Sequence, residues 1–167
     1  MYAMRKLNPD HLQAVIDLMN RGPFYQHLSM AIRELSLGHS LVELVLGPEH
    51  LNPFGGLHGG VYASAIDTAA YWSVYGDLEE ETGYSTLDLR VDFLAPVKTG
   101  KIIVKGRRLK IGKTIGLAEA TALDENGKWL AHGLSKIMVL PDTQSILEAA
   151  RFLGSAPIPP KFITKPV

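Results

Sequence analysis

The 167-residue chain contains no cysteine, which excludes disulfides, zinc thiolates, iron–sulfur clusters and cysteine nucleophiles. It also lacks an excess of either charge, because 17 Lys and Arg residues balance 17 Asp and Glu residues. Nucleic-acid binders and polybasic membrane surfaces carry a strong basic excess, so we expect neither a nucleic-acid nor a membrane partner. No apolar run approaches about 18 residues, and the first residues contain no apolar signal core, so we expect a cytoplasmic protein.

What remains is an ordinary globular composition, with 46% hydrophobic and 20% charged residues. The length fits one domain, and we expect a single domain over 1–167. Its core is expected over about residues 30–140. A helical extension is expected over 1–29, and a C-terminal helix with a proline-rich tail over 141–167.

The N-terminal and C-terminal parts show helix signals. Apolar spacing predicts an amphipathic helix over 8–20 with Asn8 as its cap. A short helix is expected in the tail, capped by Asp142 or Thr143 and ended by Gly154. Residues 155–167 are then either an extended arm or a frayed end.

Between these ends, strand patterns surround one helix. A strand pair is expected over 30–46, with a turn near Gly38, and a buried helix over 61–75, where small and apolar residues occupy every side. Four further strands are expected over 84–94, 101–111, 114–123 and 128–140. This order predicts an α+β fold in which one antiparallel sheet packs against one helix.

Alternation along 84–94 predicts that the two faces of this strand differ. One face is expected to carry Leu87, Leu89, Val91 and Phe93, and the other Thr86, Asp88, Arg90 and Asp92.

The segment His58-Gly59-Gly60 stands where the buried helix should begin, after a loop rich in glycine and proline. The first N–H groups of a helix lack intrahelical partners and lie at the positive end of its dipole. Such an N–H can bind a carbonyl oxygen and the oxyanion that it becomes. The residues alone leave open the alternative that Gly59 and Gly60 only permit a tight turn.

Asp67 is a carboxylate on a helix with little other charge. Burial should raise its pKa, which suits a general base. The alternative is a structural carboxylate that is hydrogen-bonded to the backbone, Thr68 or Tyr71. Gly59 and Asp67 are about 12 Å apart along a helix axis, so one substrate carbonyl cannot contact both in one chain. Two helices that run antiparallel across a two-fold axis would bring Gly59 of one subunit to Asp67 of the other.

These residues belong to a larger set of motifs: Asn52-Pro53, Gly56, His58-Gly59-Gly60, Asp67, Thr86, Phe93-Leu94-Ala95-Pro96 and Gly112-Lys113. The combination, over roughly residues 30–140, resembles the hotdog-fold acyl-CoA thioesterases of the 4-hydroxybenzoyl-CoA thioesterase superfamily, in particular their phenylacetate-pathway (PaaI-type) branch. The resemblance implies a long helix wrapped by an antiparallel sheet and assembly into a homodimer or homotetramer. It also implies hydrolysis of an acyl-CoA by water with no metal and no cofactor, since coenzyme A is part of the substrate.

The resemblance also implies roles for individual residues. The Gly59 N–H would polarise the thioester carbonyl, and Asp67 of the other subunit would activate water or attack directly. Asn52 would help to place the water, His58 would lie near the thioester, and Thr86 would face the reaction centre.

Further residues are expected to bind the substrate: Gly60, Lys110, Gly112 and Lys113. The basic residues near the 112–113 turn form a local rim that suits the phosphates of coenzyme A. The alternative is that exposed lysines protect sheet edges from mispairing.

The remaining histidines show no metal-ligand spacing and are expected to be surface or packing residues: His11, His27, His39, His50 and His132. Two other functions stay open at this point. One is a non-catalytic acyl-CoA-binding or regulatory hotdog domain. The other is a hydratase or dehydratase, which needs a histidine base paired with an acid and has only His58 as a candidate. The acyl group and the choice between coenzyme A and acyl-carrier protein are also open.

Overall fold

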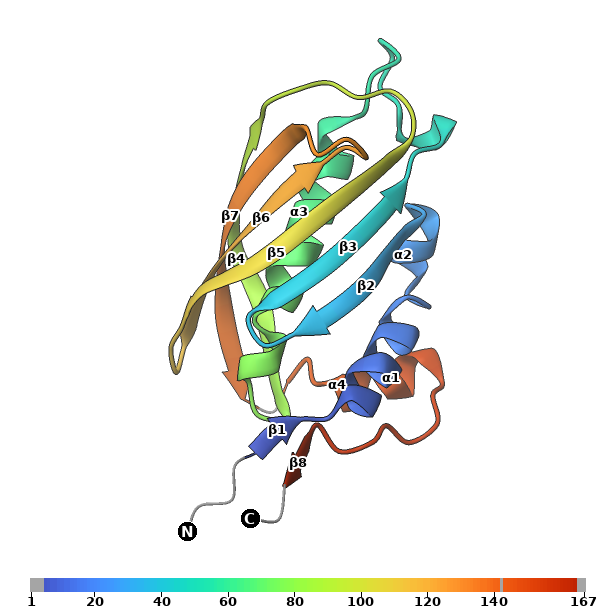
Figure 1. Cartoon of the computed structure of the whole chain (residues 1–167). Coiled ribbons are helices and arrows are strands. Elements are labelled where there is room, and N and C mark those ends of the chain that lie inside the picture. The colour runs from blue at the N-terminus through green and yellow to red at the C-terminus, as the bar shows by residue number, and fades with distance from the viewer. Residues whose placement is uncertain (1–4, 142, 165–167) are drawn as a thin grey trace.

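The computed structural model describes residues 5–141 and 143–164, and its centre is a six-stranded antiparallel sheet that curves around the long helix α3 (Figure 1). The strand order is β2-β3-β5-β6-β7-β4. The strands are β2 (Met30–Ser36), β3 (His39–Val45), β4 (Thr82–Phe93), β5 (Lys101–Ile111), β6 (Ile115–Leu123) and β7 (Trp129–Pro141), and α3 is Gly59–Ser73. The predicted α+β arrangement of one sheet against one helix is confirmed.

Two glycines allow α3 to lie very close to the sheet. A Cβ at Gly106 on β5 would stand 2.1 Å from the carbonyl oxygen of Ala69, and one at Gly133 on β7 would stand 2.5 Å from a methyl carbon of Ile66. Ile66 and Ala69 are fully buried. The middle of the helix therefore lies directly against the sheet, and a larger residue at either glycine position would push the helix away.

A β-bulge changes the predicted faces of β4. Thr86 pairs with Ile137 and Asp88 pairs with Lys136, so Leu87 is an extra residue without a partner. The alternation that placed Thr86 on the face opposite Leu89 is therefore wrong. Thr86 shares the helix-facing side of the sheet with Leu89, and Leu87 points outward, half exposed.

The N-terminal extension contains the predicted helix, α1 (Pro9–Met19), and the side chain of Asn8 caps it by accepting from the backbone N–H of Asp10 at 3.1 Å. Two elements were not predicted, β1 (Arg5–Leu7) and α2 (Pro23–His27).

The C-terminal helix α4 (Ile146–Leu153) ends at Gly154 as predicted, with φ 65°. Its cap is Ser145, which accepts from the backbone N–H of Glu148. Thr143 as the cap is therefore wrong, and the alternative cap Asp142 lies outside the described residues.

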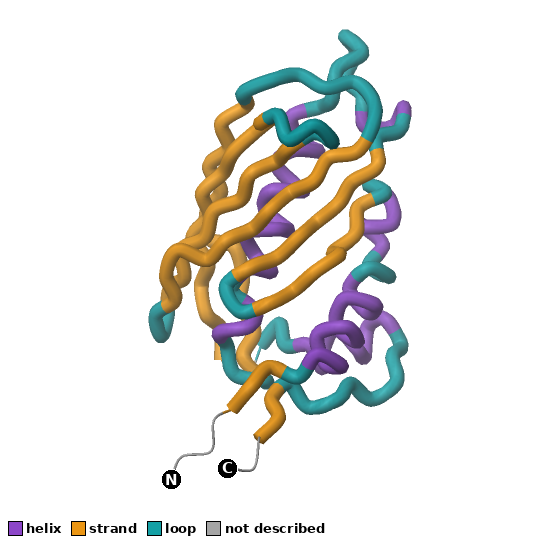
Figure 2. The backbone as a smooth tube through the Cα atoms, in the orientation of Figure 1, coloured by secondary structure: helices purple, strands orange, loops and turns teal. Residues whose placement is uncertain are grey.

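The chain beyond α4 is an extended arm up to residue 164 (Figure 2). Its strand β8 (Phe162–Thr164) pairs with β1. Just before β8, the fully buried Lys161 donates from Nζ to the carbonyl oxygens of Tyr75 (2.7 Å) and Leu78 (2.8 Å), in and after the 3₁₀ turn η2 (Tyr75–Asp77). Of the two predicted alternatives, the extended arm is confirmed for the described part of the tail.

No helix within the described ranges is long and apolar enough to cross a membrane.

Candidate active site

The loop before α3 is a closed hairpin built on polar contacts. It follows the 3₁₀ turn η1 (Pro48–His50), and a bridge between Leu51 and Leu57 closes its base. The side-chain oxygen of Asn52 accepts from the backbone N–H groups of Phe54 (2.9 Å) and Gly56 (3.2 Å). The Asn52 NH₂ group donates to no acceptor in the described part of the chain, so it is free to bind a water molecule or a substrate.

His58 caps α3, which begins at Gly59, two residues earlier than predicted. Its Nδ1 accepts from the Gly60 N–H at 2.9 Å, so a neutral His58 carries its proton on Nε2. The Gly60 N–H is thereby occupied, while the Gly59 N–H donates to no described residue. No carboxylate among the described residues pairs with His58, so the histidine–acid pair that a hydratase requires is not formed by these residues.

An apolar hollow of about 430 Å³ opens beside Gly59. Leu57, Tyr62, Phe93 and Leu94 contribute to its walls. The Phe93 ring lies so near that a Cβ at Gly59 would stand 3.2 Å from its Cζ atom. Glycine allows this close approach of the ring, and it leaves the N–H open to an incoming carbonyl group.

Asp67 lies on the same helix and is partly buried. The hydroxyl of Thr86 donates to its Oδ1 at 2.8 Å, across the gap between α3 and β4. The side chains named in the alternative interpretation, Thr68 and Tyr71, are not the partners. The partner is Thr86, which the bulge at Leu87 turns inward. Burial raises the pKa of Asp67 above its ordinary value, and the hydrogen bond from Thr86 opposes part of this rise. The predicted direction of the shift is confirmed.

The face of α3 that carries Asp67 is the least covered side of the helix. The residues of α3 that are not buried recur at helical spacing: Gly59, Gly60, Ala63, Ser64, Asp67 and Tyr71. Since eight residues separate Gly59 from Asp67, the free amide and the carboxylate are about 12 Å apart along the axis. Both groups lie on the less covered side of the helix, but at different points along it.

Comparison with known proteins now assigns the chain to a family. Residues 54–131 match the Thioesterase superfamily. The protein SSO1253 of Saccharolobus solfataricus is 30% identical over 132 residues, which cover 78% of this chain and 87% of that protein. Human acyl-coenzyme A thioesterase 13 is 27% identical over 126 residues, which cover 73% of this chain and 89% of that protein. The chain belongs to the thioesterase superfamily.

The architecture agrees with this assignment. The crystal structure of thioesterase HI1161 from Haemophilus influenzae superposes with a TM-score of 0.72 at 21% identity, covering 86% of this chain and 97% of that chain. The predicted hotdog fold is thereby confirmed, and so is the predicted class, a thioester hydrolase. The narrower PaaI-type branch stays a prediction.

The predicted phosphate-binding residues of this thioesterase lie on the β5–β6 hairpin. Strand register places that hairpin level with Thr86, because Ile111 pairs with Gly116, Gly116 with Ile137, and Ile137 with Thr86. The hairpin therefore lies at the Asp67 end of the site and not at the Gly59 end. Lys110 and Lys113 are both exposed there.

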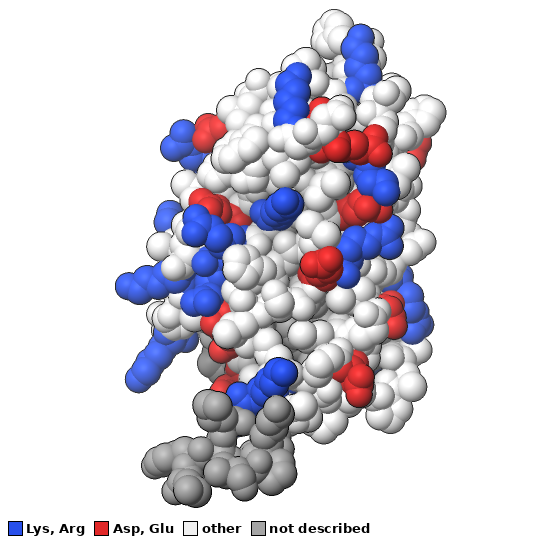
Figure 3. All heavy atoms as spheres, in the orientation of Figure 1, with Lys and Arg blue, Asp and Glu red and all other residues white. Residues whose placement is uncertain are grey.

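Two other basic residues of β5 form ion pairs on the sheet. Lys101 forms an ion pair with Glu43, and Arg107 with Glu119. Figure 3 shows acidic and basic side chains interspersed over the outer face of the sheet, with basic side chains projecting at the left, where the β5–β6 hairpin lies.

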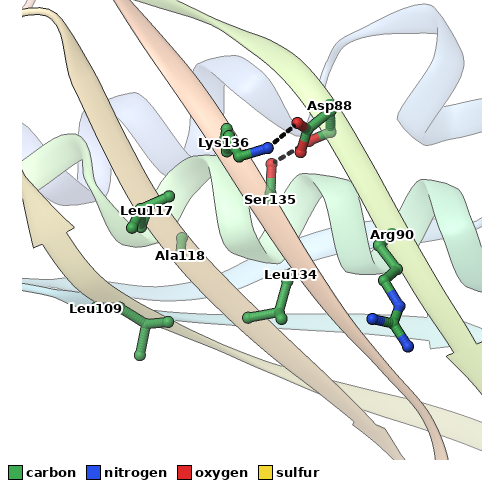
Figure 4. Close-up of a pocket in the computed structure, with 8 residues that line it drawn as sticks. All are labelled: Asp88, Arg90, Leu109, Leu117, Ala118, Leu134, Ser135 and Lys136. Atoms are coloured by element: carbon green, nitrogen blue, oxygen red, sulfur yellow. Dashed lines mark hydrogen bonds and ion pairs between the residues drawn. The ribbon is translucent and has the colours of Figure 1, made fainter.

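A second hollow, of about 380 Å³, lies on the outer face of the sheet (Figure 4). Leu109, Leu117 and Leu134 point into it from β5, β6 and β7, and an Asp88–Lys136 ion pair borders it. It faces away from α3, so it is separate from the Gly59 and Asp67 groups.

His50, which was expected to be a surface or packing residue, lies next to the site. Its ring is fully buried, and its Nδ1 accepts from the Gly47 N–H at 2.9 Å. Its only signal in the sequence is its place two residues before Asn52.

Proposed function

We propose that this thioesterase hydrolyses an acyl-CoA or aryl-CoA to the free acid and coenzyme A. One observation carries the proposal: a partly buried carboxylate, Asp67, with a raised pKa lies on the open side of a helix whose first N–H, that of Gly59, is unoccupied. A base and an oxyanion donor are the two groups that hydrolysis of a thioester by water requires.

In the proposed reaction the thioester carbonyl oxygen accepts from the Gly59 N–H. A water molecule attacks the carbonyl carbon while Asp67 takes its proton. The tetrahedral intermediate then expels the coenzyme A thiolate, which recovers the proton from Asp67. The free NH₂ of Asn52 and the Nε2–H of His58 hold the water and the thioester. Alternatively, Asp67 attacks directly, and water hydrolyses the resulting anhydride.

The proposed site lies between two subunits, because the gap along α3 is too long for one carbonyl group. The outer edge of β4 pairs with no other described strand. Exposed apolar side chains lie in this strand at Leu87 (50%) and Phe93 (59%), and directly after it at Leu94 (54%). An unpaired apolar edge is a site for strand pairing with a second chain. A homodimer, or a homotetramer of two such dimers, would bring Gly59 of one subunit to Asp67 of its partner.

Coenzyme A would bind at the Asp67 end of the site. Lys110 and Lys113 supply positive charge for its phosphates, and the Gly112 turn between them allows close approach. Gly60 would contribute backbone surface, since its N–H already donates to His58. The β5–β6 hairpin of each subunit would bind the coenzyme A of the site that lies beside the β4 edge of the same subunit.

Thiol release from a panel of acyl-CoAs, measured for the wild type and Asp67→Asn, tests the assignment. We expect turnover of some substrate, and a loss of about 10²-fold or more in the variant with binding retained. Asp17→Asn, at an exposed carboxylate on α1, is the matched control and should keep full activity. Binding of acyl-CoA without thiol release by the wild type would instead indicate the non-catalytic binding domain.

The shared site has its own test. Gly59→Ala and Asp67→Asn subunits are mixed, unfolded and refolded together. Random pairing makes half of the dimers mixed, and each mixed dimer holds one intact site, so about a quarter of wild-type activity should return. If each site were formed within one chain, mixing would restore nothing.

Single-turnover hydrolysis in ¹⁸O-labelled water separates the two roles of Asp67. Direct attack, followed by addition of water to the Asp67 carboxyl carbon of the anhydride, would leave the label in the Asp67 carboxylate after one turnover. General-base catalysis would place the label only in the released acid, so label in Asp67 is the result that identifies direct attack.

A further inference from the structure

His50 is a fully buried polar side chain beside the loop that carries Asn52. Its Nδ1 accepts from the Gly47 N–H at 2.9 Å. The proton of the neutral ring is therefore on Nε2, which has no hydrogen-bond partner among the residues described. A Glu49 carboxylate oxygen stands 3.8 Å away, too far for a hydrogen bond.

Burial of an unpartnered N–H costs free energy that an apolar side chain of similar size would avoid. Leucine would fill the same space without that cost. What histidine supplies here and leucine does not is the acceptor at Nδ1, which ties the ring to the backbone of Gly47.

The backbone of His50 also makes two hydrogen bonds, one to each side of the loop that carries Asn52. Its N–H donates to the Gly47 carbonyl oxygen at 3.1 Å, and its carbonyl oxygen accepts from the His58 N–H at 2.9 Å. The ring and the main chain thus connect the turn at Gly47 to the cap of α3. Asn52 lies on the hairpin between His50 and His58.

We infer that His50 is a positioning residue of the thioesterase reaction. Its buried ring holds the residue against Gly47, and its carbonyl oxygen accepts from the N–H of His58. Together these contacts fix the separation between the Asn52 amide and the Gly59 N–H. The inference rests on the proposed function, in which both groups contact the reacting thioester or water. A displacement of about 1 Å in such groups can reduce turnover by about 10²-fold without a change in the binding surface.

Three substitutions separate the acceptor from simple packing. His50→Asn places an oxygen near the position of Nδ1 and should keep kcat within about threefold of the wild type. His50→Gln places its amide near Nε2, and His50→Leu removes both nitrogens. These two should lose about 10-fold or more in kcat, with KM within about threefold, because the loop shifts while the substrate surface remains.

The matched control is His11→Leu. His11 is also a buried histidine, but both of its ring nitrogens are hydrogen-bonded, to Tyr75 and Pro159, near the other end of α3. We expect this variant to unfold at a lower temperature and to keep its kcat. If His50→Leu does not fold, the Asn and Gln variants alone decide.

Equal kcat in the Asn and Gln variants of an active enzyme would overturn the role of His50, as would equal kcat in His50→Leu and His11→Leu. A wild type that releases thiol from no acyl-CoA would instead overturn the proposed function.

Discussion

The hydroxyl of Thr86 should control the pH dependence of the enzyme. It donates to the Asp67 carboxylate at 2.8 Å, and Thr86→Val removes this bond while keeping the shape of the side chain. A hydrogen bond to a charged group contributes about 1.5–3 kcal/mol. One pKa unit corresponds to about 1.36 kcal/mol, so a fully buried bond would shift the pKa by about 1–2 units. Asp67 is only partly buried, and we expect a rise of about 1 unit.

The assay is kcat/KM for a good acyl-CoA substrate as a function of pH, which reports ionisations of the free enzyme. The active form of Asp67 is the carboxylate, so activity falls as pH drops through its pKa. In Thr86→Val this acid limb should move to higher pH by about 1 unit. On the alkaline plateau, activity should stay within about threefold, because a more basic carboxylate accepts a proton more readily. Thr86→Ser keeps a hydroxyl, so its acid limb should lie at the same pH as that of the wild type.

Two results would refute the reasoning. An acid limb that stays in place, or moves to lower pH, in a folded Thr86→Val protein would mean that the bond does not stabilise the ionised carboxylate. An equal loss of activity at every pH would mean that Thr86 orients Asp67 without tuning it.

Three further predictions follow from the same geometry. Gly59→Ala should lower kcat/KM about tenfold or more, because its Cβ would crowd the Phe93 ring and turn the amide; thiol release measures this. Asp67→Asn should raise the thermal midpoint at pH 7. The folded-state pKa of Asp67 is raised, so its ionisation costs stability above that pKa, and the gain should vanish near pH 4. Burial lowers the pKa of Lys161 to about 8, so the unfolded chain binds more protons between about pH 8 and 10. Urea unfolding at pH 7 and 10 should therefore show wild-type stability rising with pH relative to Lys161→Met.

The regular elements were predictable because their signals are local. The spacing of apolar residues gave the strands and α1, and the Asn8 cap was correct. The cap of α4 was also readable, since Ser145 followed by Glu148 three residues later forms a capping box, yet Asp142 and Thr143 were chosen. That error was one of interpretation and did not reflect missing information.

The bulge at Leu87 was not predicted for a different reason. Strict alternation along one strand is the simplest pattern, and it breaks only because β7 pairs Thr86 and Asp88 with consecutive residues. A bulge is a property of two strands, so the sequence of β4 alone does not show it. For the same reason β1 and β8 were not predicted. Each is a three-residue segment that is ordered by pairing with the other end of the chain.

The residues of the site also divide into those with a local signal in the sequence and those whose role depends on the fold. Gly59, His58 and Asp67 stood out because glycine at a helix start and a carboxylate on an apolar helix are unusual in any context. Thr86 as the partner of Asp67 depends on the bulge, and the burial of His50 depends on how the loop folds back. Neither has a local cause that a single sequence displays.

The close packing of α3 explains how these distant segments form one site. Gly106 and Gly133 let the helix lie against β5 and β7 with no room for a side chain between them, so the distance between helix and sheet is set by direct contact. The contact from β4 to Asp67 is then fixed by the same packing that forms the core, and functional groups on rigid elements keep their geometry better than groups on loops. Asn52 is the exception, because it lies on a hairpin. His50, a polar residue that packing alone does not require, is buried in the turn directly before this hairpin.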